Sequence, residues 1–385
     1  MTNFLYSAVS DVLVGPDTSS QLGDLAAAMG IKRALIVTDP GIIKFGLLDA
    51  AVTNLEANNI ELSIYSDVIA DPPESVVMDA VSSAQTFGCD GVIGFGGGSS
   101  MDVAKLLAVL IKGEQQLAEI YGVDQISGGR LPLIQVPTTA GTGSEATMVS
   151  IITTGETTKA GVVSRTLLAD KIILDAKLTL GLPAAVTAAT GIDAMVHAIE
   201  AYTSVRLKNP LSDMLAREAL RLMADNISTA VKQGNNLQAR EAMLLGAMLA
   251  GQAFANAPVA AVHALAYPLG GNYHIPHGLS NSLVLPHVLR FNAPAAAELY
   301  AELAPIILPG RTLPSDALEV SELLAQHFLQ LAADLGLQTR LRDMNIAEPD
   351  LPKLAEEAML QQRLLMNNPR ELSLNDALSI YQQAF

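Results

Sequence analysis

Short apolar runs alternate with helical stretches over the first 180 residues of the chain. Residues 34–38 form a continuous apolar run, which is the pattern of a strand buried on both faces of a sheet. The expected strands are 34–38, 61–65, 91–95 and 133–137, and the expected helices between them are 46–58, 73–87 and 101–110. This alternation predicts an α/β domain with a mostly parallel sheet covered by helices.

The pattern changes near Leu182-Pro183. Beyond this point apolar residues recur at helical spacing, Ala, Leu, Met and Glu are frequent, and strand signals almost disappear. The expected helices are 184–203, 210–232, 238–255, 258–270, 294–304, 315–335 and 350–362. Because 385 residues are also long for one core, we predict two domains, an α/β domain over 1–181 and an all-α domain over 182–385.

Composition narrows the range of partners and the compartment. A formal charge of −16 repels phosphate backbones and anionic membranes, and an aromatic content of 4% without tryptophan argues against a base-stacking surface. The apolar stretches are interrupted before they reach the length of a membrane span, and the N-terminus has no signal-peptide pattern. The one cysteine, Cys89, fits a reducing compartment and a small core residue better than a catalytic thiol. We therefore expect a cytoplasmic protein with no nucleic-acid or membrane partner.

Asp193 and His197 are the most informative residues of the second half. They lie four residues apart in a predicted helix, so they share one face and can hold the same divalent cation. His263 and His277 follow at longer range in a chain with only six histidines. One carboxylate and three imidazoles suit Fe, Zn, Co or Ni better than Mg or Ca.

Each of these residues has an ordinary alternative role. Taken singly, Asp193 would be a solvated or capping carboxylate, and each histidine would be a hydrogen-bonded core residue. The spacing of the four residues and their apolar surroundings together favour one shared site. Glu200, three residues after His197, either orients that ring from behind or is a surface charge, and the sequence does not choose between these roles.

Two glycine-containing loops follow predicted strands of the first half. Gly96-Gly97-Gly98-Ser99 opens a helix, so its free N–H groups and the helix dipole can hold a pyrophosphate, although it lacks the third glycine of the dinucleotide fingerprint. The second loop, 137–145, is rich in Thr and Gly and supplies hydroxyl groups. Either loop alone could be a tight turn without a ligand. Two such loops after parallel strands point to one crevice that holds a dinucleotide.

Asp39 follows the strand at 34–38. A carboxylate at this position accepts hydrogen bonds from a ribose diol and repels a 2′-phosphate, which favours NAD over NADP. The alternative is a plain Asp-Pro turn.

Taken together, these segments resemble the iron-dependent (group III) alcohol dehydrogenase family. The glycine run near 96–105, the loop 137–145, the segments 191–204 and 263–287, and the C-terminal Asn368-Pro369-Arg370 with Asp376 and Ile380-Tyr381 match its pattern in the same order, over essentially the whole chain. The resemblance implies an N-terminal dinucleotide-binding domain, a helical metal-binding domain, and an active-site cleft between them.

The resemblance also assigns residues and partners. The implied metal ligands for Fe²⁺, with Zn²⁺ as the alternative ion, are Asp193, His197, His263 and His277. The implied NAD-binding residues are Asp39, Gly96, Gly97, Gly98, Ser99, Asp102, Thr138, Thr139, Thr142 and Lys159. The implied activity is NAD-dependent interconversion of a small alcohol and its aldehyde or ketone by hydride transfer, in a homodimer or higher homo-oligomer.

The chain departs from the family at Tyr267, where a second histidine implicated in proton transfer is frequent. A phenol with a pKa near ~10 relays protons poorly at neutral pH, so His274 or the cofactor ribose is the alternative relay. We assign the catalytic group as His263, His277, Tyr267 and His274. A tyrosine here also resembles the hydroxyacid–oxoacid transhydrogenase branch.

Several activities therefore stay open besides alcohol dehydrogenase. They are a transhydrogenase, a hydroxyacid dehydrogenase such as one for 4-hydroxybutyrate, a glycerol-dehydrogenase-like or dehydroquinate-synthase-like zinc enzyme, and a metal-binding protein without catalysis.

Overall fold

The structure is a computed structural model of the 385-residue chain and describes residues 3–155 and 158–385. The chain divides into two compact units. The α/β unit spans Ser7–Gly181, and the helical unit spans Leu182–Phe385 and includes residues 3–6. These N-terminal residues were expected in the first domain, but their contacts group them with the helices.

Six parallel strands form the main sheet of the α/β unit, in the order β1-β9-β6-β4-β2-β3. Their bounds are β1 Asp11–Val14, β2 Arg33–Val37, β3 Glu61–Tyr65, β4 Gly91–Gly96, β6 Leu133–Pro137 and β9 Lys171–Leu174. The order reverses at β2, which pairs with β3 on one side and with β4 on the other. Such a reversal opens a crevice at the carboxyl ends of the strands.

Side chains that alternate along β2 divide the core of the α/β unit into two layers. Leu35 and Val37 pack with α4 and α5, whereas Ala34 and Ile36 pack with α1 and α3. The helices are α1 Leu22–Ala28, α3 Asp49–Ala57, α4 Glu74–Phe87 and α5 Gly98–Lys112. Cys89 lies in the first of these layers, where burial raises the pKa of its thiol. The expected α/β fold with a parallel sheet is confirmed.

Several short elements of this unit were not expected from the pattern. They are β1 and β9, the helix α2 (Pro40–Lys44), and a small second sheet of β5 (Gly122–Val123), β7 (Val149–Thr154) and β8 (Thr158–Val163). The antiparallel pair β7–β8 is partly exposed and carries a weak apolar signal. Strands of four residues such as β1 and β9 are too short for periodicity to reveal.

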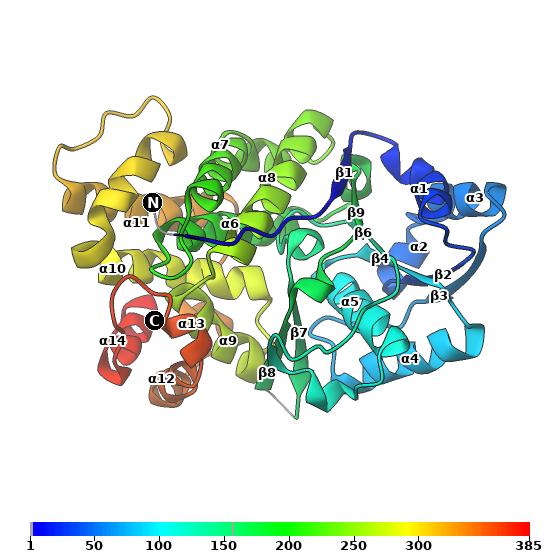
Figure 1. Cartoon of the computed structure of the whole chain (residues 1–385). Coiled ribbons are helices and arrows are strands. Elements are labelled where there is room, and N and C mark those ends of the chain that lie inside the picture. The colour runs from blue at the N-terminus through cyan, green and yellow to red at the C-terminus, as the bar shows by residue number, and fades with distance from the viewer. Residues whose placement is uncertain (1–2, 156–157) are drawn as a thin grey trace. The chain divides into compact units, whose positions relative to one another are not determined.

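Helix α6 (Ala184–Thr203) is central to the helical unit (Figure 1). All of its residues from Gly191 to Thr203 are buried, and it packs against α7, α8 and α10. The principal helices around it are α7 Pro210–Lys232, α8 Leu237–Asn256, α9 Ala261–Tyr273, α10 His277–Ile307, α11 Ala317–Asp334, α12 Leu351–Met359, α13 Gln362–Leu365 and α14 Leu374–Ala384. A helix that is buried on all sides belongs in the middle of such a bundle.

Helix α10 is the largest difference from the sequence-based expectation. It runs for 31 residues, whereas only 294–304 was predicted helical. It contains Pro286, Pro294 and Pro305, which read as helix breaks because proline removes an N–H and its ring crowds the preceding turn. Here the helix continues through all three, with its inner face packed on α6, α9 and α11.

Within the described residues, no single helix is both long and apolar enough to cross a membrane. Helices α8 and α9 together have the length and apolar composition of a membrane span, but they are bent by 108° relative to each other.

Helix α10 approaches α6 closely at Gly278. A Cβ added there would lie 2.4 Å from the carbonyl oxygen of Ala189 and 3.2 Å from Cβ of Asp193. The absence of a side chain at residue 278 therefore allows the two helices to come together.

We predict that Gly278→Ala lowers the free energy of unfolding of the helical unit by about 1–3 kcal/mol, because the helices must separate to relieve the overlap. Gly270→Ala is the matched control. Its Cβ would lie 3.6 Å from the nearest atom, the carbonyl oxygen of Ile275, so helix propensity alone should keep it neutral or slightly stabilising. Urea unfolding followed by circular dichroism measures both. Equal losses in the two variants would contradict the prediction.

Candidate functional site

The four predicted ligand residues lie together in the helical unit. Asp193 and His197 are one turn apart on α6, His263 is in the first turn of α9, and His277 begins α10. One potential ligand atom from each residue lies within 4.8 Å of all the others. The imidazole rings of His197 and His263 are stacked with centroids 4.8 Å apart, and His277 follows at 5.3 Å from His263. Three helices therefore deliver four side chains to one point.

Burial differs among the four side chains. Asp193, His197 and His263 are buried, whereas the side chain of His277 is 38% exposed. The cluster is thus enclosed on the α6 and α9 sides and reachable from solvent beside His277. A buried carboxylate surrounded by imidazoles can bind a cation tightly. The exposed side of the cluster leaves one coordination position open to a small molecule.

Glu200 fixes the orientation of His263. Its Oε1 accepts the backbone N–H of Val262 at 2.7 Å, and its Oε2 lies 2.6 Å from Nδ1 of His263. A carboxylate only accepts hydrogen bonds, so Nδ1 carries the proton and Nε2 presents its lone pair to the cluster. Glu200 is buried and is not a surface charge, and the ring that it orients belongs to His263 on α9 rather than to His197.

Asp193 is held as a carboxylate by its neighbours. Burial alone would raise its pKa, but the imidazoles of His197, His277 and His263 and an N–H of Asn281 together hold the pKa below its ordinary value. Oδ1 of Asp193 lies 3.6 Å from Nε2 of His277 and 3.9 Å from Nε2 of His197. This oxygen therefore faces the same point as the imidazole nitrogens.

Aromatic and aliphatic side chains border the cluster. The ring of Phe254 lies 4.6 Å from that of His197, and the ring of Tyr267 lies 6.1 Å from that of His277. Both aromatic residues pack against a small buried apolar cluster made of Val259, Ala264 and Leu364. Tyr267 therefore stands beside the candidate ligands.

His274 has a different setting. It directly follows Tyr273, the last residue of α9, and lies in the left-handed region at φ 53°, with an exposed side chain and its N–H bonded to the carbonyl of Gly270. It is not a member of the group of four candidate ligands that the described residues form.

The donor set fits a borderline transition metal ion. Three imidazole nitrogens and one carboxylate oxygen match the ligands of Fe²⁺ and Zn²⁺, and the supporting carboxylate of Glu200 is the usual partner of a metal-bound histidine. Mg²⁺ and Ca²⁺ would require more oxygen ligands.

The loops predicted to hold the cofactor converge at the carboxyl ends of β2, β4 and β6 in the α/β unit. A Cβ on Gly96 would lie 3.3 Å from Oδ2 of Asp39, and one on Gly98 would lie 2.8 Å from Cγ2 of Thr142. A Cβ on Gly97 would lie 3.8 Å from the nearest side-chain atoms of Thr139. Without side chains, the glycines leave backbone N–H groups at the start of α5, which is the setting for a pyrophosphate.

Asp39 has two functions open to it in this geometry. Its Oδ1 caps α2 by accepting the N–H groups of Gly41 and Ile42 at 2.8 and 3.3 Å. Its Oδ2 is turned toward Gly96 at the end of the adjacent strand. The turn and the cofactor-binding interpretations are therefore compatible, because they use different oxygens.

Asp102 is engaged by the protein itself. Its Oδ1 accepts the hydroxyl of Ser144 at 2.5 Å and lies 3.4 Å from Nζ of Lys105, and its Oδ2 accepts the N–H of Ile151 at 2.8 Å. Lys105 is completely buried, and burial lowers the pKa of its ammonium. Burial likewise raises the pKa of Glu145 to about 7. This network joins α5 to the Thr-rich loop, and the sequence analysis did not identify it.

The remaining predicted cofactor residues are spread over the α/β unit. Thr138 is buried and donates its N–H to the carbonyl of Gly96, and Ser99 lies in the first turn of α5. Lys159 is on β8, where its ammonium contacts Asp71 at 2.6 Å and Thr153 at 3.0 Å.

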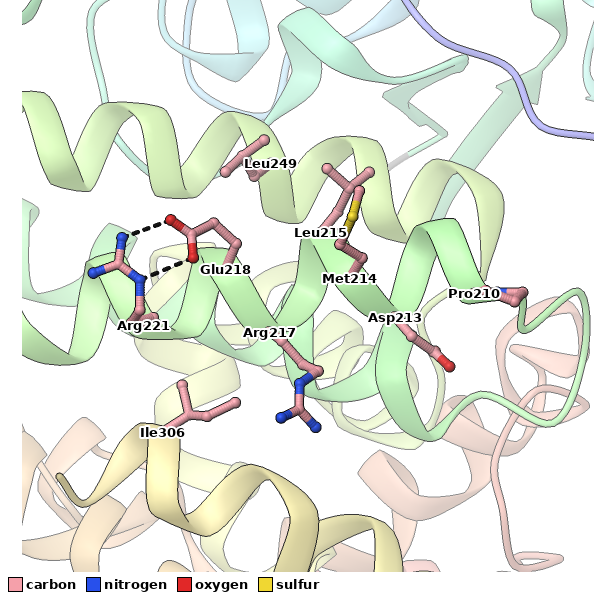
Figure 2. A pocket seen from close by; sticks show the side chains of 9 residues that line it. All are labelled: Pro210, Asp213, Met214, Leu215, Arg217, Glu218, Arg221, Leu249 and Ile306. Atoms are coloured by element: carbon pink, nitrogen blue, oxygen red, sulfur yellow. Dashed lines mark hydrogen bonds and ion pairs between the residues drawn. The ribbon is translucent and has the colours of Figure 1, made fainter.

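A separate groove of about 870 Å³ lies on the helical unit (Figure 2). It is lined by α7, α8 and α10, and Arg221 and Glu218 form a two-pronged ion pair along it. None of the predicted ligand, cofactor or catalytic residues lines it, so we assign it no role.

Comparisons with known proteins identify the family to which both units of the chain belong. Residues 10–176 match the family "Iron-containing alcohol dehydrogenase", and residues 187–385 match "Fe-containing alcohol dehydrogenase family, C-terminal". Long-chain-alcohol dehydrogenase 1 of Geobacillus thermodenitrificans is 40% identical over 375 residues, which are 97% of this chain and 94% of that protein. NAD-dependent methanol dehydrogenase of Bacillus methanolicus is 30% identical over the full length of both chains.

Solved structures show the same likeness. A crystal structure of a 1,3-propanediol oxidoreductase superposes with a TM-score of 0.96 at 37% identity and covers 100% of both chains. The family matches account for both units, and the relatives span the whole chain. The protein therefore belongs to the iron-containing alcohol dehydrogenase family of oxidoreductases.

Proposed function

We propose that this protein is a metal-dependent, NAD-dependent alcohol dehydrogenase that interconverts a small alcohol and its aldehyde or ketone. The observation that carries the proposal is the group of one carboxylate and three imidazoles within 4.8 Å of one another, in a chain of the iron-containing alcohol dehydrogenase family. Monitoring NADH absorbance with a panel of alcohols, with and without added Fe²⁺ or Zn²⁺, tests it. Bound metal and cofactor without turnover of any alcohol would favour a binding protein instead.

Asp193, His197, His263 and His277 would hold the metal, with Fe²⁺ as the proposed ion and Zn²⁺ as the alternative. When bound, the metal would supply Lewis-acid chemistry at the substrate oxygen, and NAD would supply the acceptor or donor of the hydride. Glu200 keeps Nε2 of His263 available as a donor throughout. The partial exposure of His277 gives a small alcohol a route to the cluster.

The α/β unit would bind NAD. Gly96, Gly97 and Gly98 offer backbone N–H groups at the start of α5, and Oδ2 of Asp39 faces the same loop. The NAD dependence printed in the name of the Bacillus methanolicus relative supports this choice of cofactor. For Asp102 we propose an indirect part, through Ser144, in shaping the Thr-rich loop.

Alcohol oxidation releases a proton, and Tyr267 and His274 are the proposed relay residues. Tyr267 lies beside the candidate ligands, since the centroid of its ring is 6.1 Å from that of His277. His274 is exposed at the end of α9 and would exchange a proton directly with solvent.

Tyr267 also favours a second candidate, a hydroxyacid–oxoacid transhydrogenase or hydroxyacid dehydrogenase of the same family. A transhydrogenase retains its cofactor and cycles it between two substrates. Incubating the purified enzyme with a hydroxyacid and an oxoacid, without added NAD, separates the two activities: exchange supports the transhydrogenase, and its absence together with NAD-dependent alcohol oxidation excludes it.

We extend the proposal to a cytoplasmic homodimer or higher homo-oligomer, in line with the family resemblance and with a single, buried cysteine suited to a reducing compartment. Light scattering of the purified protein measures the assembly state.

We expect His263→Ala and His277→Ala each to retain less than about a tenth of the wild-type metal, since even the loss of a supporting contact costs about 10–100-fold in affinity. Activity should fall with metal content. Metal analysis and NADH absorbance on the same samples provide the check.

His274→Asn is the control for these variants, because asparagine tolerates the left-handed backbone at this position. It should keep the metal, and a relay role would appear only as a lower kcat with a shifted pH profile. A fully active variant of His263 or His277 that lacks metal would refute the proposed centre.

Asp39→Asn should improve the use of NADP relative to NAD by roughly tenfold or more, since the repulsion between two unit charges about 4 Å apart is about 1 kcal/mol in water and about 4 kcal/mol near a protein surface, and about 1.4 kcal/mol is tenfold. Asparagine keeps an oxygen that can cap α2, so the loss of charge is separated from the loss of the cap. The ratio of kcat/KM for the two cofactors is the measurement. An unchanged ratio would show that Asp39 serves only as a cap.

A further inference from the structure

Asn281 lies one turn after His277 on α10 and is completely buried. Its carboxamide nitrogen is 2.5 Å from Oδ1 of Asp193. The same nitrogen is 3.3 Å from Nε2 of His263 and 3.3 Å from Nε2 of His277. One amide group therefore faces the inward atoms of three of the four candidate ligands.

The contact with Asp193 fixes which end of the amide points inward. The nitrogen and oxygen of a carboxamide have nearly the same shape, so hydrogen bonding decides between the two orientations. With the oxygen inward, the amide oxygen and Oδ1 of Asp193, both of them acceptors, would meet at 2.5 Å without a donor between them. With the nitrogen inward, one N–H is donated to Asp193 and the second is turned toward the two imidazoles.

The opposite end of the same amide is left unsatisfied. Oδ1 of Asn281 is buried and has no hydrogen-bond partner among the described residues. A buried acceptor without a partner costs free energy, so such groups are rare in native proteins and each one calls for a physical explanation. The amide oxygen of Asn281 therefore lacks a hydrogen bond, while the amide nitrogen contacts Asp193, His263 and His277.

The N–H of Asn281 is donated to Oδ1 of Asp193, which is the candidate ligand atom of that carboxylate. Oδ1 of Asp193 is the carboxylate oxygen that also faces His197 and His277. Rotation of a carboxylate about its last bond is loosely restricted by itself. A hydrogen bond to one oxygen fixes the plane of the group and leaves that oxygen turned inward.

We propose that Asn281 is a positioning residue of the metal centre: its carboxamide N–H orients Asp193 and so sets the affinity and the coordination geometry of the bound divalent cation. The inference rests on the metal site proposed above and adds to it a residue outside the ligand set. Glu200 acts on His263 from α6, and Asn281 acts on Asp193 from α10, so each supports a ligand on another helix.

The test uses Co²⁺ as the probe, because its visible absorption bands report on coordination geometry independently of turnover. Metal-free full-length protein is titrated with Co²⁺, with a chelator as competitor, for the wild type and for Asn281→Leu and Asn281→Ala. Both variants remove the N–H but differ in volume, so a shared effect belongs to the N–H, and either variant carries the test if the other does not fold.

Asn292→Leu is the matched control. Asn292 is also buried on α10, and it exchanges hydrogen bonds with Asn368 at 3.0 and 2.7 Å, so it tests the loss of a buried amide elsewhere on the helix. We expect Asn281→Leu and Asn281→Ala to bind Co²⁺ about 10–100-fold more weakly, with shifted bands. The Asn292 variant should keep the wild-type affinity and spectrum, even if it is less stable.

Unchanged Co²⁺ affinity and bands in a folded Asn281 variant would overturn the proposal. An equal loss in Asn292→Leu would also overturn it, because the effect would then come from general weakening of α10. Failure of the wild type itself to bind Co²⁺ would instead refute the metal centre, and with it any role of Asn281 there.

Discussion

The candidate metal centre depends on the pair formed by Glu200 and His263. A buried carboxylate would be costly if left unpaired, and Glu200 uses both oxygens, one on the backbone of Val262 and one on the imidazole of His263. The pair joins α6 to the first turn of α9 and determines which ring nitrogen can bind a cation. Because α6 also supplies Asp193 and His197, this one helix provides two candidate ligands and the support of a third. The close approach of α10 at Gly278 then adds the fourth.

The sequence revealed part of this site because some of its geometry is local. Asp193 and His197 share a helix face by spacing alone, and the structure places them at one point with the two later histidines. The partner of Glu200 was not predictable, since its contact with His263 depends on how α6 and α9 pack. Asn281 was missed for a similar reason, although its position four residues after His277 is the same spacing that identified the first pair.

The fold was predictable where elements are long or continuously apolar, and less so elsewhere. The bounds of α6 and α7 agree with the apolar periodicity to the residue, whereas α10 was recognised only in part because its prolines read as breaks. The β7–β8 pair is short and half-exposed, so neither alternation nor a buried run marks it. The network around Lys105 joins α5 to a loop some 40 residues away, as its contact with Ser144 shows, and no local pattern encodes such a contact.

The four candidate ligands, Glu200 and Asn281 all belong to the helical unit, and the glycine loops and Asp39 all belong to the α/β unit. The distances among the candidate ligand atoms are therefore internal to one folded unit. A rigid rotation of either unit would leave the proposed coordination sphere intact, so exchange of the proposed NAD would require no metal ligand to dissociate. An enzyme organised in this way can acquire its metal once, during maturation, and keep it through many catalytic cycles.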